Sequence, residues 1–297
     1  MRPRDIALAL LIAVIWGFNF VAIRMGLAGL PPMLLVAVRF ALSAFPAILF
    51  VPRPVVAPRY LLLYGLFMGV GQAGLLYGGI KLGMPAGLAS IVAQSQAFFT
   101  LLLASIFLHE RIFLHNVVGA CVAFAGLALI ALRFDASVPA VGLLMTLGAA
   151  FSWGCGNIVT RKLGRVDPVG LSVWSSLIPP IPMFLLSVLL EGVDAPARVW
   201  QSLGVSTIIA TAYTAYLATI LCYALWAKLI GEYGAGRVAP FSMLVPFFGV
   251  TGIALVFGEP ITTLTMVAGA LIMAGLTIHV FGARFLRRRS PSSYPAR

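Results

Sequence analysis

The sequence predicts an all-α integral membrane protein with ten transmembrane helices, arranged as two inverted five-helix repeats. Three observations lead to this prediction: an apolar composition, a series of apolar segments, and a motif that occurs twice. Of the 297 residues, 61% are hydrophobic and 9% are charged, and the mean hydropathy is +1.06. Soluble domains carry about 25% charged residues, so this chain lacks the polar surface that a water-soluble fold needs.

The second observation is the length of the apolar segments. A helix that crosses a bilayer needs about 20 mainly apolar residues, and such segments recur between short breaks of Gly, Pro and charged residues. We expect spans at residues 6–27, 34–51, 60–80, 86–108, 115–132, 140–161, 168–190, 202–226, 234–257 and 262–282. No small-residue cleavage site follows the first segment, so we expect it to be a span and not a signal peptide.

The third observation is the repeated motif. Residues 16–24 read WGFNFVAIR and residues 153–161 read WGCGNIVTR, so Trp-Gly and a later Arg recur at an offset of 137 residues. An offset of 149 residues relates Glu110 to Glu259. Five expected spans separate the two motifs, and an odd number of crossings inverts the second copy. The chain therefore divides into a first repeat at 1–135, a second, inverted repeat at 136–284 and a basic tail at 285–297.

The basic residues predict the orientation of the chain. Lys and Arg accumulate at the cytoplasmic ends of spans. With the N-terminus inside, most basic residues fall on the cytoplasmic side, and Arg24, Lys81, Arg133 and Arg198 fall on the other side. We therefore expect both termini in the cytoplasm. The net charge of +12 follows from this topology, and we expect no binding of nucleic acid.

Inverted repeats predict a mechanism as well as a fold. Two similar halves, related by an axis in the membrane plane, can exchange conformations and so open a central site to one side and then to the other. The sequence therefore predicts a secondary transporter that works by alternating access.

Short motifs in the predicted spans resemble a known family. They are Trp16-Gly17 followed by Asn19, the pair Arg39-Phe40, and Glu110 with Gly119 and Gly126, repeated as Glu259 with Ala268 and Gly275. Together with the ten-span plan, they resemble the EamA-type branch of the drug/metabolite transporter superfamily over residues 6–282. The resemblance implies an exporter similar to bacterial inner-membrane exporters of aromatic and other neutral amino acids or related metabolites. The Ala at position 268 departs from the Gly of the first copy.

The acidic residues limit the chemistry of the site. All eight are expected at span ends or in loops, whereas a carboxylate within the spans would suit cationic drugs and proton exchange. We therefore disfavour both. The histidines, His109, His115 and His279, also lie near expected span ends. We expect no metal site, no cofactor and no catalytic residue.

Neutral polar and aromatic side chains at mid-span depth are the candidates for substrate binding. They are Trp16, Asn19, Gln72, Tyr77, Ser90, Gln94, Trp153, Asn157, Tyr213 and Tyr216. Amide and hydroxyl groups suit the charged ends of a zwitterion, and aromatic faces suit its side chain and ammonium group. The alternative for each residue is a hydrogen bond between neighbouring helices or a place at headgroup level.

Several other residues each have two interpretations. Arg39 either extends outward to the interface or meets a substrate carboxylate. Glu110 and Glu259 precede helices, so they either anchor loops at helix N-termini, which we favour, or act as gates. The Gly119 and Gly126 pair predicts close helix packing within the fold rather than dimerisation. Pro46 and the IPPIP sequence at 178–182 indicate bends in the second span of each half.

The main alternative stays within transport: a multidrug or other metabolite exporter of the same superfamily. A phosphate-bearing substrate would favour several basic residues within the spans, and only Arg39 is even partly inside one. A channel commonly has rings of charge or repeated filter carbonyls, and an intramembrane enzyme needs a metal or nucleophile within the spans. Neither pattern is visible. We expect a monomer whose partners are a small-molecule substrate and the bilayer.

Overall fold

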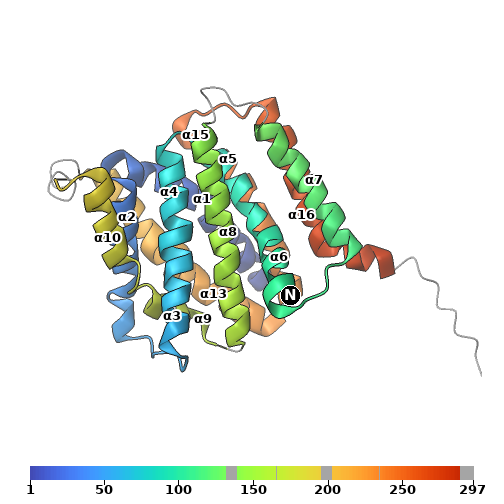
Figure 1. Ribbon diagram of the computed structural model, residues 1–297, viewed down its shortest axis with the longest axis horizontal. Coiled ribbons are helices and arrows are strands. Elements are labelled where there is room, and N and C mark those ends of the chain that lie inside the picture. The colour runs from blue at the N-terminus through green and yellow to red at the C-terminus, as the bar shows by residue number, and fades with distance from the viewer. Residues whose placement is uncertain (132–138, 165, 195–202, 234, 288–297) are drawn as a thin grey trace, which may run out of the picture.

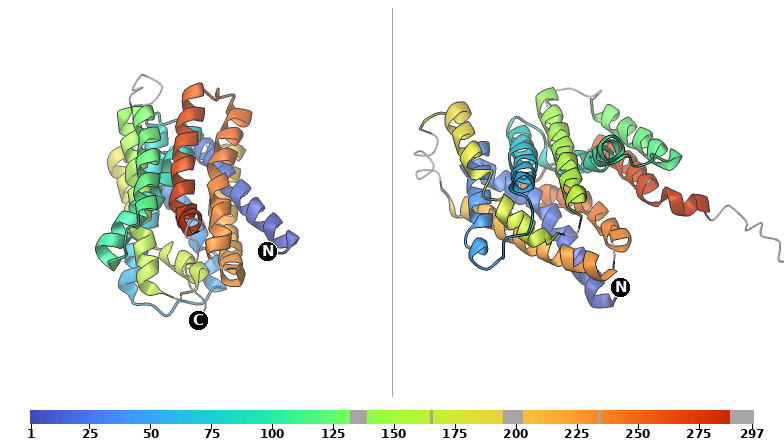
Figure 2. Two further views of the ribbon diagram at one scale, coloured as in Figure 1. Left: turned by 90° about the vertical axis from the view of Figure 1, so that its right-hand side faces the viewer. Right: turned by 60° about the horizontal axis from the view of Figure 1, so that its bottom comes forward.

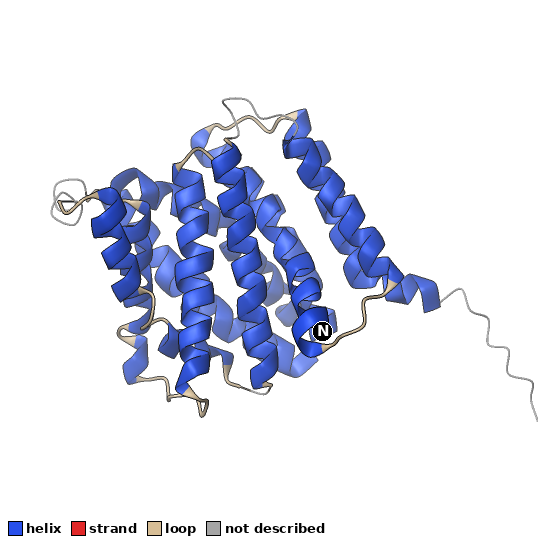
Figure 3. Ribbon diagram, in the orientation of Figure 1, coloured by secondary structure: helices blue, strands red, loops and turns tan. Residues whose placement is uncertain are grey.

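The computed structural model describes residues 1–131, 139–164, 166–194, 203–233 and 235–287, and these residues form helices joined by short connections (Figure 1; Figure 3). No strand occurs in the described ranges. The first half contains α1 (Pro3–Gly29), α2 (Pro32–Ala44), η1 (Ala47–Leu49), α3 (Pro58–Gly65), η2 (Leu66–Ala73), α4 (Gly74–Lys81), α5 (Ala86–Val92), η3 (Ala93–Ser95), α6 (Gln96–Leu108) and α7 (Leu114–Ala131). The second half contains α8 (Ala140–Leu163), α9 (Pro168–Ser175), α10 (Pro180–Glu191), α12 (Val205–Ala212), η4 (Tyr213–Leu221), α13 (Cys222–Tyr233), α14 (Ala235–Val238), η5 (Ala239–Leu244), α15 (Val245–Phe257) and α16 (Thr263–Arg287). The expected boundary at 135/136 and the tail from residue 288 lie outside the described residues.

Most of these helices are long and apolar enough to cross a membrane. Seven qualify individually, and α9 with α10 adds an eighth if the 40° bend between them lies within one span. Two shorter apolar helices, Leu114–Ile130 and Phe241–Phe257, occupy two further expected segments. The chain is therefore an all-α, multi-pass membrane protein.

Large apolar side chains on the outside of the bundle agree with this assignment. Leu144, Leu189 and Leu255 are 66–77% exposed, which water would disfavour and lipid tails do not. Other side chains are fully enclosed by neighbouring helices, such as Tyr77 of α4 and Ile12 of α1, which are 0% exposed. The bundle thus exposes large apolar side chains on its outer surface.

The two halves are interleaved in space. Helix α1 packs against α15, α6 against α8, and α7 against α16. Helix α2 packs against α10, α4 against α8, and α12 against α1. The pair of α7 and α16 forms one side of the bundle, and α1 begins and α16 ends toward the same edge (Figure 1; Figure 2).

Glycine permits the close packing of α7 and α16. A Cβ atom added to Gly119 would lie 2.6 Å from the carbonyl oxygen of Gly275, and one added to Gly275 would lie 2.6 Å from the backbone nitrogen of Ala123. A Cβ on Gly126 would likewise lie 2.8 Å from the carbonyl oxygen of Ala268. These backbones approach too closely for any side chain, so the small residues serve packing within the fold, as predicted.

The glycine of each Trp-Gly pair lies at an equivalent crossing. A Cβ on Gly17 of α1 would lie 2.9 Å from the backbone nitrogen of Gly249 on α15. A Cβ on Gly154 of α8 would lie 3.2 Å from the backbone nitrogen of Thr100 on α6. The offset of 149 residues relates Thr100 to Gly249. The repeated motif therefore marks the same contact in both halves.

Irregular backbone interrupts the second and third span of each half. Helix α2 ends before Pro46 and α9 ends before Pro179, as the proline positions predicted. The third spans contain the π-helical segments η2 and η4, which the sequence did not predict. Such segments are rare and are often found at functional sites, because they free backbone groups and redirect side chains.

Candidate functional site

A cavity lies where these interrupted helices meet. It is lined by Arg39, Phe40, Tyr64, Gly65, Met68, Gly69 and Gln72 of the first half, and by Ser172, Ser175, Ser176, Thr219 and Tyr223 of the second half. Its free space is about 30 Å³, which is room for about two water molecules. The helices must therefore move apart before anything larger than water can bind.

Arg39 is the charged group of this cavity. One terminal nitrogen, Nη1, donates a hydrogen bond to the Tyr77 hydroxyl at 2.6 Å, and Nη2 donates to Thr219 Oγ1 at 3.1 Å. The Nε atom is buried and has no hydrogen-bond partner. The guanidinium group also lies 5.4 Å from the ring centre of Phe40 and 5.7 Å from that of Tyr77. The side chain therefore points inward and not to the interface.

Among the described residues, no acidic side chain lines the cavity. The described carboxylates instead join span ends: Glu191 accepts the N–H of Met33 at 2.7 Å, Asp5 accepts the Tyr233 hydroxyl at 2.6 Å, and Asp167 caps α9. Asp135 lies outside the described residues. Within the described part of the chain, the guanidinium group of Arg39 forms no ion pair.

Of the predicted substrate residues, Gln72 lines the cavity and Tyr77 contacts its arginine. Trp16 lies nearby: its indole ring is 6.1 Å from that of Tyr223, and its Nε1 donates to the Ala218 carbonyl oxygen at 2.9 Å. Tyr213 donates its hydroxyl proton to the Ile15 carbonyl oxygen at 2.9 Å. These two bonds attach α1 to η4.

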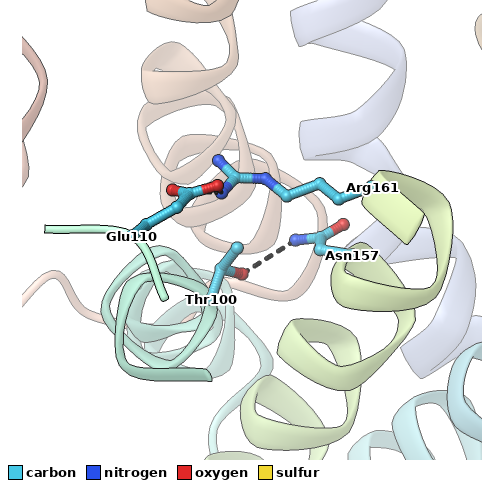
Figure 4. A network of polar contacts seen from close by, with 4 residues as sticks. All are labelled: Thr100, Glu110, Asn157 and Arg161. Carbon is cyan, nitrogen blue, oxygen red and sulfur yellow. Dashed lines mark hydrogen bonds and ion pairs between the residues drawn. The ribbon is translucent and has the colours of Figure 1, made fainter. Parts of the chain in front are cut away.

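Asn157 lies elsewhere, between α6 and α8. Its Nδ2 donates to Gln96 Oε1 at 3.1 Å. It also donates to Thr100 Oγ1 at 2.9 Å (Figure 4). Asn19, which lies about one helical turn after Trp16 of α1 as Asn157 does after Trp153 of α8, is different: its Oδ1 is buried without a partner. The two predicted asparagines are therefore in different states in this conformation.

The remaining predicted residues do not join the cavity lining. Ser90 is fully buried and donates to the Gly87 carbonyl oxygen of its own helix at 2.6 Å. Gln94 and Trp153 are half-buried. Tyr216 is 37% exposed, and its hydroxyl lies 3.5 Å from the Phe45 carbonyl oxygen. The expected single cavity is thus divided among separate contacts.

Sequence reasoning missed most of the second-half lining. Ser172, Ser175 and Ser176 form a polar stripe at spacings of three and four residues, directly before the Pro-Pro break. That pattern, and the offset of 137 residues that relates Arg39 to Ser176, could have identified them. Tyr64 and Tyr223 offered no comparable signal, because tyrosine is frequent near span ends.

The repeated Arg and Glu residues pair with each other. Arg24 of α1 forms an ion pair with Glu259, next to α15, and its guanidinium lies 4.2 Å from the ring centre of Phe257. Arg161 of α8 pairs with Glu110, next to α6, at 2.7 Å (Figure 4). The offsets relate Arg24 to Arg161 and Glu110 to Glu259. The two pairs are therefore equivalent contacts.

The comparison with family models divides the chain into the same two halves. The EamA-like transporter family model matches residues 4–132 and again residues 140–281. The chain belongs to the EamA-like transporter family. It is a membrane transporter and not an enzyme.

Curated relatives of this EamA-like transporter match nearly full length. A protein of Salmonella typhimurium named "Probable amino-acid metabolite efflux pump" is 46% identical over 97% of this chain and 98% of its own length. A protein of Escherichia coli with the same name is 43% identical over 96% and 97%. A "Probable terminal-alkyne amino-acid exporter" of Streptantibioticus cattleyicolor is 29% identical over 97% and 96%.

A solved crystal structure shares the fold of the transporter. It superposes with a TM-score of 0.64 and 18% sequence identity, over 98% of this chain and 100% of the other. The likeness covers the whole bundle.

Proposed function

We propose that this transporter exports neutral amino acids, including aromatic ones, or closely related metabolites across the bacterial inner membrane by alternating access. The cavity is the observation that carries the proposal. It combines one cationic group with hydroxyls, an amide and aromatic rings, and both halves contribute to it. A zwitterion with an apolar side chain fits this lining. The names of the curated relatives, which refer to amino-acid metabolites and an amino acid, support this substrate class.

The helix contacts support two inverted repeats of five spans. The contacts of the two halves can be compared by replacing each span with the corresponding span of the other half. If α1 corresponds to α8 and α15 to α6, the contact of α1 with α15 becomes that of α8 with α6. The contacts of α8 with α3, η2 and α4 likewise become those of α1 with α12, η4 and α13, and the contact of α7 with α16 maps onto itself. This self-consistency is what a two-fold axis in the membrane plane requires.

The size of the cavity supports alternating access. The cavity has free space for about two water molecules, so a larger substrate requires the helices to part, toward one side of the membrane and then toward the other. We propose ten crossings, with both termini in the cytoplasm because the basic residues gather at that side, and a monomer as the working unit.

The test is counterflow in proteoliposomes that contain the purified full-length chain. Vesicles loaded with unlabelled phenylalanine should accumulate external labelled phenylalanine saturably. An imposed pH gradient should not change the rate, because the described residues place no carboxylate in the cavity lining. Empty liposomes are the control. Flux restricted to cationic dyes, or no flux of any amino acid, would contradict the proposal.

A further inference from the structure

We infer that Arg39 binds the carboxylate of the exported substrate and is the group that selects carboxylate-bearing compounds. The inference rests on the proposed function and adds a residue and a chemical requirement to it. Two observations carry it: a charge in the cavity that has no counter-ion among the described residues, and a guanidinium group that two hydrogen bonds hold while its Nε–H stays free.

The unpaired charge is the first observation. An ionised side chain inside a membrane protein is costly, and such residues usually face a partner or a substrate pathway. Around Arg39 the described residues provide hydroxyls, an amide and aromatic rings but no carboxylate. A bound anion would complete this environment, and the substrate is the anion that such a cavity could receive.

The geometry of the guanidinium group is the second observation. Tyr77 and Thr219 each accept one hydrogen bond from it, and these fix the plane of the group. Its Nε–H is buried without a partner. Arginine has five N–H donors in a rigid fork that matches two carboxylate oxygens. The free Nε–H and the unused N–H of a terminal nitrogen are therefore positioned for a carboxylate once the cavity opens.

The opposite wall suits the other end of an amino acid. Ser175 and Ser176 donate their hydroxyl protons to the Ser172 carbonyl oxygen, at 3.1 and 2.7 Å. Their oxygens can therefore still accept hydrogen bonds from an ammonium group. The rings of Tyr64 and Tyr223 can contact an apolar side chain or the ammonium group. A substrate with both charges would thus extend across the cavity, from the first half to the second.

A purely structural role for Arg39 makes a different prediction. An arginine that only joins α2 to α4 and η4 would affect folding or transport of every substrate equally. An arginine that binds a carboxylate affects compounds that have one and spares those that lack it. The ratio between phenylalanine and phenylalaninamide, which keeps the ammonium group and the ring, therefore separates the two roles.

The experiment measures inhibition of labelled phenylalanine counterflow by unlabelled phenylalanine and by phenylalaninamide. In the wild-type chain we expect phenylalanine to compete much more strongly than the amide. In Arg39→Gln, the inhibition constant for phenylalanine should rise about 10- to 100-fold, the range expected for a lost charge-assisted hydrogen bond, while that for the amide stays nearly constant. Arg39→Lys keeps the charge without the fork, so it should show a smaller loss.

Arg59→Gln is the matched control, because it removes an exposed arginine outside the cavity. It should keep the wild-type ratio. Gel filtration and melting curves establish that each variant is folded, and Arg39→Lys provides the test if Arg39→Gln does not fold. A folded Arg39 variant that keeps the wild-type ratio would overturn the inference alone, whereas a wild-type chain without phenylalanine exchange would overturn the proposed function.

Discussion

Helices α1 and α8 begin the two halves of the transporter with the same Trp-Gly pair, and each uses the glycine to approach an equivalent helix. Gly17 lies against α15 and Gly154 against α6. The arginine that follows each motif pairs with an equivalent glutamate, as Arg24 with Glu259 and Arg161 with Glu110. At these helix contacts the two halves are nearly the same.

The halves differ where they line the cavity. Arg39 of the first half corresponds to Ser176 of the second half, so one wall is cationic and the other is neutral. Asn19 has a buried oxygen without a partner, whereas Asn157 bonds to two residues of α6. The repeated residues serve helix packing, and the unrepeated residues give the cavity its chemistry.

The largest expected effect comes from filling a repeated crossing. Gly17→Val should destabilise the fold by at least about 3 kcal/mol, because overpacking that displaces backbone is at the costly end of such changes. The added Cβ would lie 2.9 Å from backbone atoms of α15. The measurement is the yield of monodisperse protein and its melting temperature in detergent.

Gly231→Val is the control for this change, because a Cβ at Gly231 of α13 meets no atom within 4 Å. It should cost little stability, because valine meets no neighbouring atom there and has a higher helix propensity than glycine. Equal losses in the two variants would show that the crossing of α1 and α15 is looser than the structure indicates.

A smaller effect should distinguish the two asparagines. Asn157→Ala removes hydrogen bonds to Gln96 and Thr100, so we expect a loss of about 1–2 kcal/mol in the free energy of unfolding. Asn19→Ala removes an oxygen that has no partner, so the loss should be below that of Asn157→Ala. Melting curves of both variants test this order. Equal losses would mean that the two halves are alike at these asparagines, and a larger loss in Asn19→Ala would contradict an Oδ1 without a partner.

The smallest effects concern the two ion pairs. Breaking a partly exposed pair changes an equilibrium by about 0.5–1 kcal/mol, or roughly two- to five-fold. Glu259→Gln should increase opening of the cavity toward the periplasm, and Glu110→Gln toward the cytoplasm. The first effect should be larger, because Arg24 and Glu259 are 34% and 31% exposed, against 46% for both Arg161 and Glu110.

The readout is labelling of a Ser176→Cys variant, in a background without other cysteines, by an impermeant maleimide. Right-side-out and inside-out vesicles report the two directions. Glu232→Gln is the control, because Glu232 lies 4.0 Å from Arg2 in a pair that neither offset repeats. Shifts in the same direction for Glu259→Gln and Glu110→Gln would contradict the symmetry of the two pairs.

The sequence by itself determined that the chain lies in a lipid bilayer, that it folds into helices, and where these helices lie along the chain. Composition and segment length are enough for this, because a chain in lipid must satisfy its backbone hydrogen bonds within helices. The repeated motifs also identified the glycines of the crossings and both members of each ion pair, although not that Arg24 and Glu259 meet. The sequence named Gln72 as a candidate for substrate binding and left Arg39 between the interface and a substrate carboxylate, and both residues line the cavity.

The tertiary structure alone decided which of these polar groups share a cavity. Helical periodicity places Asn157 and Gln72 on definite faces of their own helices, but it does not say which helix each face meets. The π-helical segments η2 and η4 shift the register of the third spans, so faces extrapolated from a regular helix are displaced there. Contact between the halves spans more than a hundred residues of chain, as between Arg39 and Thr219. Only the packing of the helices brings such distant residues together. In the described part of the chain, it places Arg39 opposite a neutral wall and beside no counter-ion.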